Sequence, residues 1–317
     1  MKHPIHRAIG VIATFWILIL LLGCSGETTT STSPKLIHDQ GEVASIYTVN
    51  YPLQYLAERI VGETAKVSFP MESGSDPAYW LPSSETILGY QQADLILLNG
   101  ANYAKWVQTA TLPSAKLVNT SQAFQSELIN DANLISHSHG DEGEHSHEGL
   151  AFTLWIDPVL AAKQAKAIAG AVEQLASIDP NSVKKNLTQL TKDLGTLDKA
   201  LRLALEALSE THIIWSHPVF QYLEAKGNLS ATALHWEPDQ EPSEAQWEFL
   251  SALVKKEKKA LMIWEGAPLE STQQKLTQMG LKWMVFDPCA TRPDEGDFVT
   301  TMRANINELK QRSSEVK

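Results

Sequence analysis

One long run of helically spaced leucines constrains the fold of this chain more than any other feature. Apolar residues recur every three or four positions, which is the spacing of one helix face, at Val183, Leu187, Leu190, Leu194, Leu197, Leu201, Leu205 and Leu208. Asp179 and Pro180 supply a helix N-cap and a first-turn proline. About 29 helical residues would span roughly 43 Å. We therefore predict one helix that runs along two lobes; a coiled coil is the less favoured alternative because fewer than four heptads are present.

Segments typical of strands and helices alternate on both sides of this helix. Apolar, β-branched strands are expected before it at 45–50, 65–69, 94–99 and 116–120, and after it at 211–216, 229–234, 260–265 and 282–287. Helices are expected at 52–61, 83–91, near 106, and at 158–175, 219–226, 243–256, 269–279 and 298–310. Such strands between helices indicate parallel sheets covered on both faces. The predicted fold is α/β, with two α/β lobes of mainly parallel sheets joined by one long spine helix.

Length and composition agree with two lobes and exclude several functions. The chain has 317 residues, 43% of them hydrophobic. This length exceeds what a single hydrophobic core usually supports. A formal net charge of -11 argues against a nucleic-acid surface, which needs clustered cations. The common nucleotide-binding, zincin and serine-hydrolase motifs are missing from the sequence, so we do not expect an enzyme.

The N-terminus reads as an export and anchoring signal. Basic Lys2 and Arg7 precede an apolar run at 9–22, which matches a signal peptide and is short for a membrane span of about 20 residues. The run ends in Leu-Leu-Gly-Cys24, which resembles the bacterial lipoprotein box. We expect a signal peptide at 1–23, lipidation of Cys24, and a flexible tether at 24–42. The expected location is the cell envelope, periplasmic or on the outer face, anchored to the membrane; a plain secretory signal is the alternative.

The remaining chain divides into three parts. We expect an N-terminal α/β lobe at 43–178, the linking helix at 179–209 and a C-terminal α/β lobe at 210–317. Residues 136–149 form a segment rich in acidic side chains and in histidines, at His137, His139, His145 and His147. Imidazole and carboxylate groups suit ions such as zinc. This segment is predicted to be a metal-binding loop, and a solvated linker is the alternative.

Seven short motifs, in order along the chain, carry a family resemblance. They are Asn50–Tyr55, Gly74–Pro77, Ala93–Gly100, Trp155–Pro158, Ser216–His217, Glu241–Ser243 and Phe286–Pro288. Over roughly residues 43 to 312 the chain resembles the metal-binding (ZnuA/TroA-like) solute-binding lipoproteins of bacterial zinc and manganese ABC importers. The resemblance implies a monomer that captures Zn²⁺ or Mn²⁺ as cargo between its lobes. It also implies an ABC permease in the membrane as the partner.

The resemblance implies ion ligands from four places in the chain. His217 and Asp287 match two of them, whereas Ala78 and Thr153 stand where the family has histidines. Two protein ligands are too few for a tight zinc site. The candidates to complete the site are Cys289, Glu265, His235, Asp76 or a histidine of segment 136–149. A Cys289 thiolate beside His217 would favour zinc over manganese.

The sequence is also compatible with three other functions. A surface lipoprotein with a degenerate cleft could buffer metal through its His-rich segment. A repurposed cleft could bind a small organic ligand by stacking on tryptophans, with Trp80, Trp215, Trp236 and Trp264 as candidates. A metallohydrolase would need a general base, for which Glu265 is the nominal candidate. His212 lies five positions from His217, on the opposite strand face, and is expected to be structural.

Overall fold

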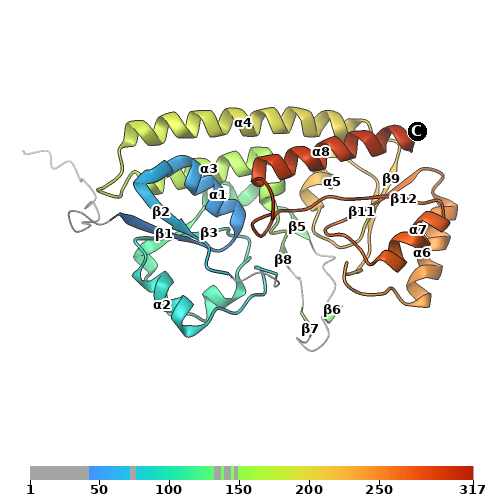
Figure 1. Cartoon of the computed structure of the whole chain (residues 1–317), viewed down its shortest axis with the longest axis horizontal. Coiled ribbons are helices and arrows are strands. Elements are labelled where there is room, and N and C mark those ends of the chain that lie inside the picture. Colours follow the sequence, from blue (N-terminus) through green and yellow to red (C-terminus); the bar gives the residue numbers. More distant parts are fainter. Residues whose placement is uncertain (1–42, 72–75, 132–136, 139–143, 146–148, 317) are drawn as a thin grey trace, which may run out of the picture. The chain divides into compact units, whose positions relative to one another are not determined.

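The computed structural model describes residues 43–71, 76–131, 137–138, 144–145 and 149–316 (Figure 1). The predicted signal peptide and tether lie outside the described residues, and so does Cys24. His139 and His147 of the His-rich segment also lie outside them.

The first lobe is built on a four-stranded parallel sheet. Its order is β2-β1-β3-β4, with β1 at Ala44–Thr48, β2 at Ala65–Ser68, β3 at Leu95–Leu98 and β4 at Leu117–Asn119. In the register, Ile46 lies opposite Val67 on one side and Leu95 on the other. The helices are α1 (Tyr51–Val61), α2 (Ser84–Gln92) and α3 (Pro158–Val172). The expected helix near Trp106 is a short 3₁₀ segment, Lys105–Gln108.

The second lobe repeats this architecture. Its four-stranded sheet has the order β10-β9-β11-β12, all parallel, with β9 at His212–Trp215, β10 at Ala231–Ala233, β11 at Ala260–Trp264 and β12 at Lys282–Val285. The helices are α5 (Gln221–Gly227), α6 (Glu244–Lys256), α7 (Glu270–Gln278) and α8 (Phe298–Glu315). The predicted α/β fold with two mainly parallel sheets is confirmed.

The spine helix is α4, Pro180–Glu206. The Asp179 carboxylate accepts the backbone N–H groups of Asn181 and Ser182, at 3.1 and 3.2 Å, and so caps the helix as predicted. The leucine face of α4 is buried, and the helix contacts α1 and α3 of the first lobe and α5 and α8 of the second. Its other face is polar apart from the exposed Leu203. Across the part of the chain that the structure describes, helices with the length and apolarity to cross a membrane are lacking.

Strand alternation divides the second lobe between two hydrophobic cores. Ile213 and Trp215 of β9 belong to a large core shared with α4 and the first lobe, whereas Ile214 belongs to a smaller core. The smaller core is covered by Trp247 and Leu250 of α6 and by Leu276 of α7. Successive strand residues point to opposite faces, so each face of this sheet has its own helical cover.

Hydrogen bonds link the two lobes where their strands end. The Trp155 indole N–H donates to the Pro288 carbonyl at 2.8 Å, and the Tyr51 backbone N–H donates to the Ala290 carbonyl at 3.0 Å. Tyr222 of α5 donates its hydroxyl proton to the Ala151 carbonyl at 2.9 Å. The loops that follow the strands of both sheets therefore lie against one another, which is where parallel α/β sheets usually bind ligands.

One short antiparallel strand pair borders the His-rich segment, and a second lies within it. β5 (Asn130–Asp131) pairs with β8 (Gly149–Leu150), and β6 (His137–Ser138) pairs with β7 (Glu144–His145). The register sets His137 directly opposite His145. The sequence predicts a metal-binding loop here, and its polar composition does not indicate this backbone pairing.

Candidate metal-binding site

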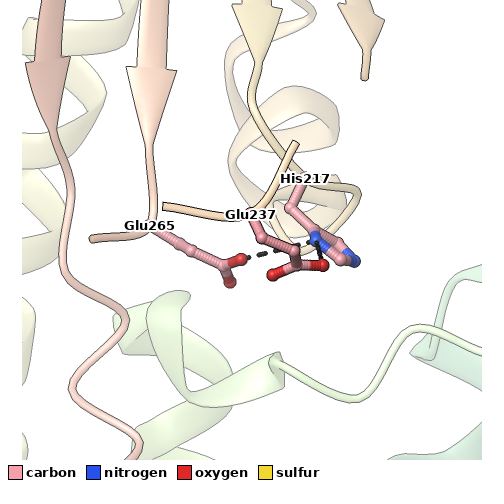
Figure 2. Close-up of side chains that lie close together, drawn as sticks. All are labelled: His217, Glu237 and Glu265. Atoms are coloured by element: carbon pink, nitrogen blue, oxygen red, sulfur yellow. Dashed lines mark ion pairs between the residues drawn. The ribbon is translucent and has the colours of Figure 1, made fainter. Parts of the chain in front are cut away.

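Three strands of the second lobe end in side chains that meet. His217 lies two residues beyond β9, Glu237 lies beyond β10, and Glu265 follows β11 directly. β9 is the middle strand of these three, since it pairs with β10 on one side and β11 on the other. Parallel strands bring their carboxyl ends to one edge of the sheet. Figure 2 shows the three side chains converging below the strand ends.

The distances within this group are short. The His217 Nδ1 atom lies 3.1 Å from Glu237 Oε1 and 3.5 Å from Glu265 Oε1. One ligand atom from each residue lies within 4.8 Å of the other two. His217 is buried, with a side chain 7% exposed, and the two glutamates are partly buried. We call these three residues the triad; they offer one imidazole nitrogen and two carboxylates to a metal ion.

The electrostatics of the triad favour a bound cation. Burial, helped by the charges of Glu237 and Asp76, raises the pKa of Glu265 to about 7 against the opposing effect of His217. Burial lowers the pKa of His217, but its hydrogen bond with Glu237 and the nearby carboxylates prevail and raise it above the ordinary value. Carboxylates held this close together repel one another. A divalent ion would compensate that repulsion.

The first lobe contributes a further carboxylate beside the triad. The Asp76 charge acts on both His217 and Glu265. Its Oδ1 atom accepts the backbone N–H of Ala78 at 2.8 Å, and the backbone N–H groups of Tyr79 and Trp80 donate to its carbonyl. Ala78 itself is buried. Asp76, proposed from the sequence as a completing ligand, is therefore held by a tight turn near the triad.

Thr153 borders the same place. Its hydroxyl donates to the Val219 carbonyl at 2.5 Å. Thr153, His217 and Gln221 contribute to the lining of a cavity of about 10 Å³, which is about the room that one water molecule needs. Where the family resemblance implies a second histidine, this chain places a hydroxyl that is already engaged with the opposite lobe.

His235 lies next to the triad and outside it. Its ring is centred 5.9 Å from the ring of His217, at an interplanar angle of 71°. Burial lowers the pKa of His235, and the neighbouring His217 lowers it further, while Glu237 acts in the opposite direction. An imidazole that stays neutral is a competent metal ligand, so His235 remains a candidate to complete the shell.

Asp287 and Cys289 do not join the triad among the described residues. Asp287 follows β12, which pairs with β11 and is two strands away from β9. Its carboxylate accepts the Cys289 N–H at 2.7 Å, and its backbone is bonded to the Asn305 amide of α8. Cys289 is buried, and burial together with Asp287 raises the pKa of its thiol to about 12. Their roles as ligands stay predictions.

Sequence reasoning missed Glu237. It lies two residues after His235, in the loop that follows β10. The rule that ligands gather at the carboxyl ends of adjacent parallel strands would have selected it, because β10 neighbours the strand that precedes His217.

Other singled-out side chains have structural roles. The two ring nitrogens of His212 lie 3.0 Å from the Ser230 hydroxyl and 2.9 Å from the Thr232 hydroxyl, at the amino end of β9. Trp215, Trp236 and Trp264 are buried in the cores, which leaves them no face on which an organic ligand could stack. Trp80 is partly buried and packs edge-on against Phe69 and Trp106.

Comparison with known proteins places the chain in a family. The family described as ZnuA, zinc-uptake complex component A, periplasmic, matches residues 46–312. The zinc-binding lipoprotein AdcA of Streptococcus pneumoniae strain R6 is 28% identical over 279 residues, and the alignment covers 84% of this chain and 55% of that protein. The chain thus spans about half the length of that relative. The high-affinity zinc uptake system protein ZnuA of Bacillus subtilis strain 168 is 26% identical over 319 residues, with 95% of each protein covered.

Solved structures agree with the fold. The metal-dependent lipoprotein YcdH of Bacillus subtilis superposes with a TM-score of 0.72 at 23% identity, over 84% of this chain and 98% of that one. The Zn(II)-bound ZnuA-like domain of Streptococcus pneumoniae AdcA superposes with a TM-score of 0.71, also at 23% identity, over 86% and 99%. The family match covers nearly all of the described chain, both lobes and all three triad residues, and the chain therefore belongs to the ZnuA family.

Proposed function

We propose that this chain is the extracytoplasmic solute-binding component of an ABC importer, which captures a divalent metal ion and delivers it to a membrane permease. The observation that carries the proposal is the triad, in which one imidazole and two carboxylates converge within 4.8 Å. Relatives named for zinc binding and zinc uptake support zinc as the cargo. Family membership supports a transport component rather than an enzyme.

The triad offers a zinc ion three of its ligands. Zinc accepts nitrogen and oxygen ligands, usually four in a tetrahedral arrangement. His217, Glu237 and Glu265 would supply three, and Asp76 or His235 would be the nearest protein group for the fourth position. Asp76 comes from the first lobe and the triad from the second. An ion bound to the triad and to Asp76 would therefore join the lobes.

The flanking segments would serve the same task. A lipid on Cys24 and the tether at 24–42 would keep the protein, as a monomer, close to its permease, and the name lipoprotein in relatives supports this location in the cell envelope. The histidines of segment 136–149 would gather ions near the site.

Zinc calorimetry tests the proposal. In the full chain, replacing His137, His139, His145 and His147 by asparagine removes the competing imidazoles and should leave one tightly bound zinc per chain. In that background, His217→Ala should weaken zinc binding by at least about 100-fold, more than the loss of a mere supporting contact. His212→Gln is the matched control and should bind zinc normally, since His212 begins the strand that precedes His217 and its ring nitrogens face hydroxyl groups.

The outcomes separate the alternatives. Loss of all zinc binding after the four asparagine substitutions would overturn the receptor proposal and favour metal buffering by the His-rich segment. Unchanged affinity in His217→Ala would remove the triad from the site.

A further inference from the structure

Glu237 is held in place by a loop that is anchored on both sides. The backbone N–H of Trp236 donates to the Ser216 carbonyl at 2.8 Å, directly beside His217. The Trp236 ring is buried against Trp247 and Trp264, with ring centres 4.9 and 6.1 Å away. On the other side, the Pro238 carbonyl accepts the Leu269 N–H at 3.0 Å. The position of the Glu237 carboxylate therefore follows from packing and backbone bonds.

The segments that carry the two glutamates also pack against each other. A Cβ atom on Gly266, the residue after Glu265, would lie 3.3 Å from Cγ of Pro238, the residue after Glu237. Such a distance is tighter than a normal side-chain contact, so glycine permits the close approach. The fold thus brings together two carboxylates that repel each other in the absence of an ion.

From this arrangement we infer that Glu237 sets the ion preference of the site. Its carboxylate is the second oxygen ligand of the triad, and this ligand lets the site accept Mn²⁺ as well as Zn²⁺. The inference rests on the proposed function and deepens it. Imidazole suits zinc, whereas carboxylates suit harder ions such as manganese. Here two carboxylates face one imidazole, with the Asp76 carboxylate close by. For a given set of ligands zinc binds more tightly than manganese. Replacing nitrogen ligands by oxygen ligands makes the difference between the two affinities smaller.

Competition between the two ions tests this inference. The protein for this test is the full chain carrying the four asparagine substitutions at 137, 139, 145 and 147. Electron paramagnetic resonance follows the six-line signal of free Mn²⁺, which should reveal one saturable manganese site from which zinc displaces the ion. Glu237→His should raise the ratio of zinc to manganese affinity at least tenfold, because it exchanges an oxygen ligand for a nitrogen ligand. Glu237→Gln keeps the shape of the side chain and should weaken both ions, manganese more than zinc. Circular dichroism verifies that each variant is folded.

Glu241→His is the matched control. Glu241 also precedes a proline in the same loop, but its carboxylate accepts the Ser271 hydroxyl instead of meeting His217. The affinity ratio should therefore stay at the parent value. A parent chain that binds one zinc but no manganese, or an unchanged ratio in Glu237→His, would overturn the inference and leave the proposed function standing. A parent chain that binds neither ion would overturn both.

Discussion

At Glu265 the ion-free fold and ion binding favour opposite charge states of one side chain. Its carboxylate is partly buried, 3.5 Å from the His217 ring, and near two other acidic groups. Burial and those neighbours raise its pKa to about 7, from 4.5 in an unfolded chain. The ion-free fold therefore disfavours the charged form of the same group that an ion would require.

The raised pKa of Glu265 makes the stability of the ion-free protein depend on pH. Between pH 4.5 and about 7 the folded chain holds a proton on Glu265 that the unfolded chain has lost. The contribution of this group to the free energy of unfolding therefore falls as the pH rises through that window, and stays low above it. Glu265→Gln should stabilise the ion-free protein by roughly 1 to 3 kcal/mol at pH 8 and by much less at pH 5.

Urea unfolding in the presence of a chelator measures this effect at the two pH values. The same variant should bind zinc at least tenfold more weakly, because it lacks one charged ligand. An equal stability change at pH 5 and pH 8 would contradict the assigned titration.

At the scale of elements, α4 and α5 use glycine for different reasons. Gly195 lies inside α4, and a Cβ atom there would meet nothing within 4 Å. Gly227 ends α5, and a Cβ atom there would lie 2.8 Å from Leu229 Cγ and 3.1 Å from Leu205 Cβ of α4. The first glycine only adds backbone freedom, whereas the second lets α5 approach the spine helix.

Alanine substitutions should therefore have opposite effects at these two positions. Gly195→Ala should raise the free energy of unfolding by about 0.5 to 1 kcal/mol. Gly227→Ala should lower it by about 1 to 3 kcal/mol through overpacking. Thermal unfolding of the two variants beside the parent chain checks both signs. Gly170→Ala in α3, where a Cβ atom also meets nothing within 4 Å, is a control that should follow Gly195→Ala.

At the scale of the whole molecule, one lysine joins both lobes to the spine helix. The Lys226 Nζ atom of α5 lies 3.0 Å from Asp157 Oδ1 and 2.6 Å from Asp198 Oδ1. Asp157 caps α3 of the first lobe, and Asp198 belongs to α4. The Lys226 side chain is only 3% exposed. Three helices thus share one buried cation close to the segment that carries Thr153.

Removing this cation should destabilise the whole fold. Lys226→Met leaves the poorly solvated Asp157 carboxylate without its ammonium, while Asp198 keeps only Arg202 as a cationic partner. The loss should lower the free energy of unfolding by about 3 kcal/mol. Lys256→Met is the control, because Lys256 is 79% exposed and should change stability little. Urea unfolding measures both. A small effect of Lys226→Met would mean that the lobes are joined mainly by their apolar core.

Elements could be predicted from the sequence because their signals are local. The α4 start follows from Asp179 and Pro180, and its buried face from leucine spacing. The eight predicted strands of the two sheets are all confirmed, since apolar runs between helices identify buried parallel strands. His217 and Glu265 were both proposed as ligands, and the structure brings them together.

The complete candidate site could not be predicted in the same way. Glu237 is 20 residues from His217 along the chain, and its proximity depends on β10 lying beside β9. Asp287 also follows an apolar strand, β12, that the sequence predicts. Because β12 lies at the sheet edge, two strands from β9, Asp287 does not join the triad.

The sequence by itself therefore determined the elements, their order and the family, because periodicity, caps and short motifs act over a few neighbouring residues. Only the tertiary structure decided which acidic side chains gather around His217, because strand order sets which loops share one end of a sheet.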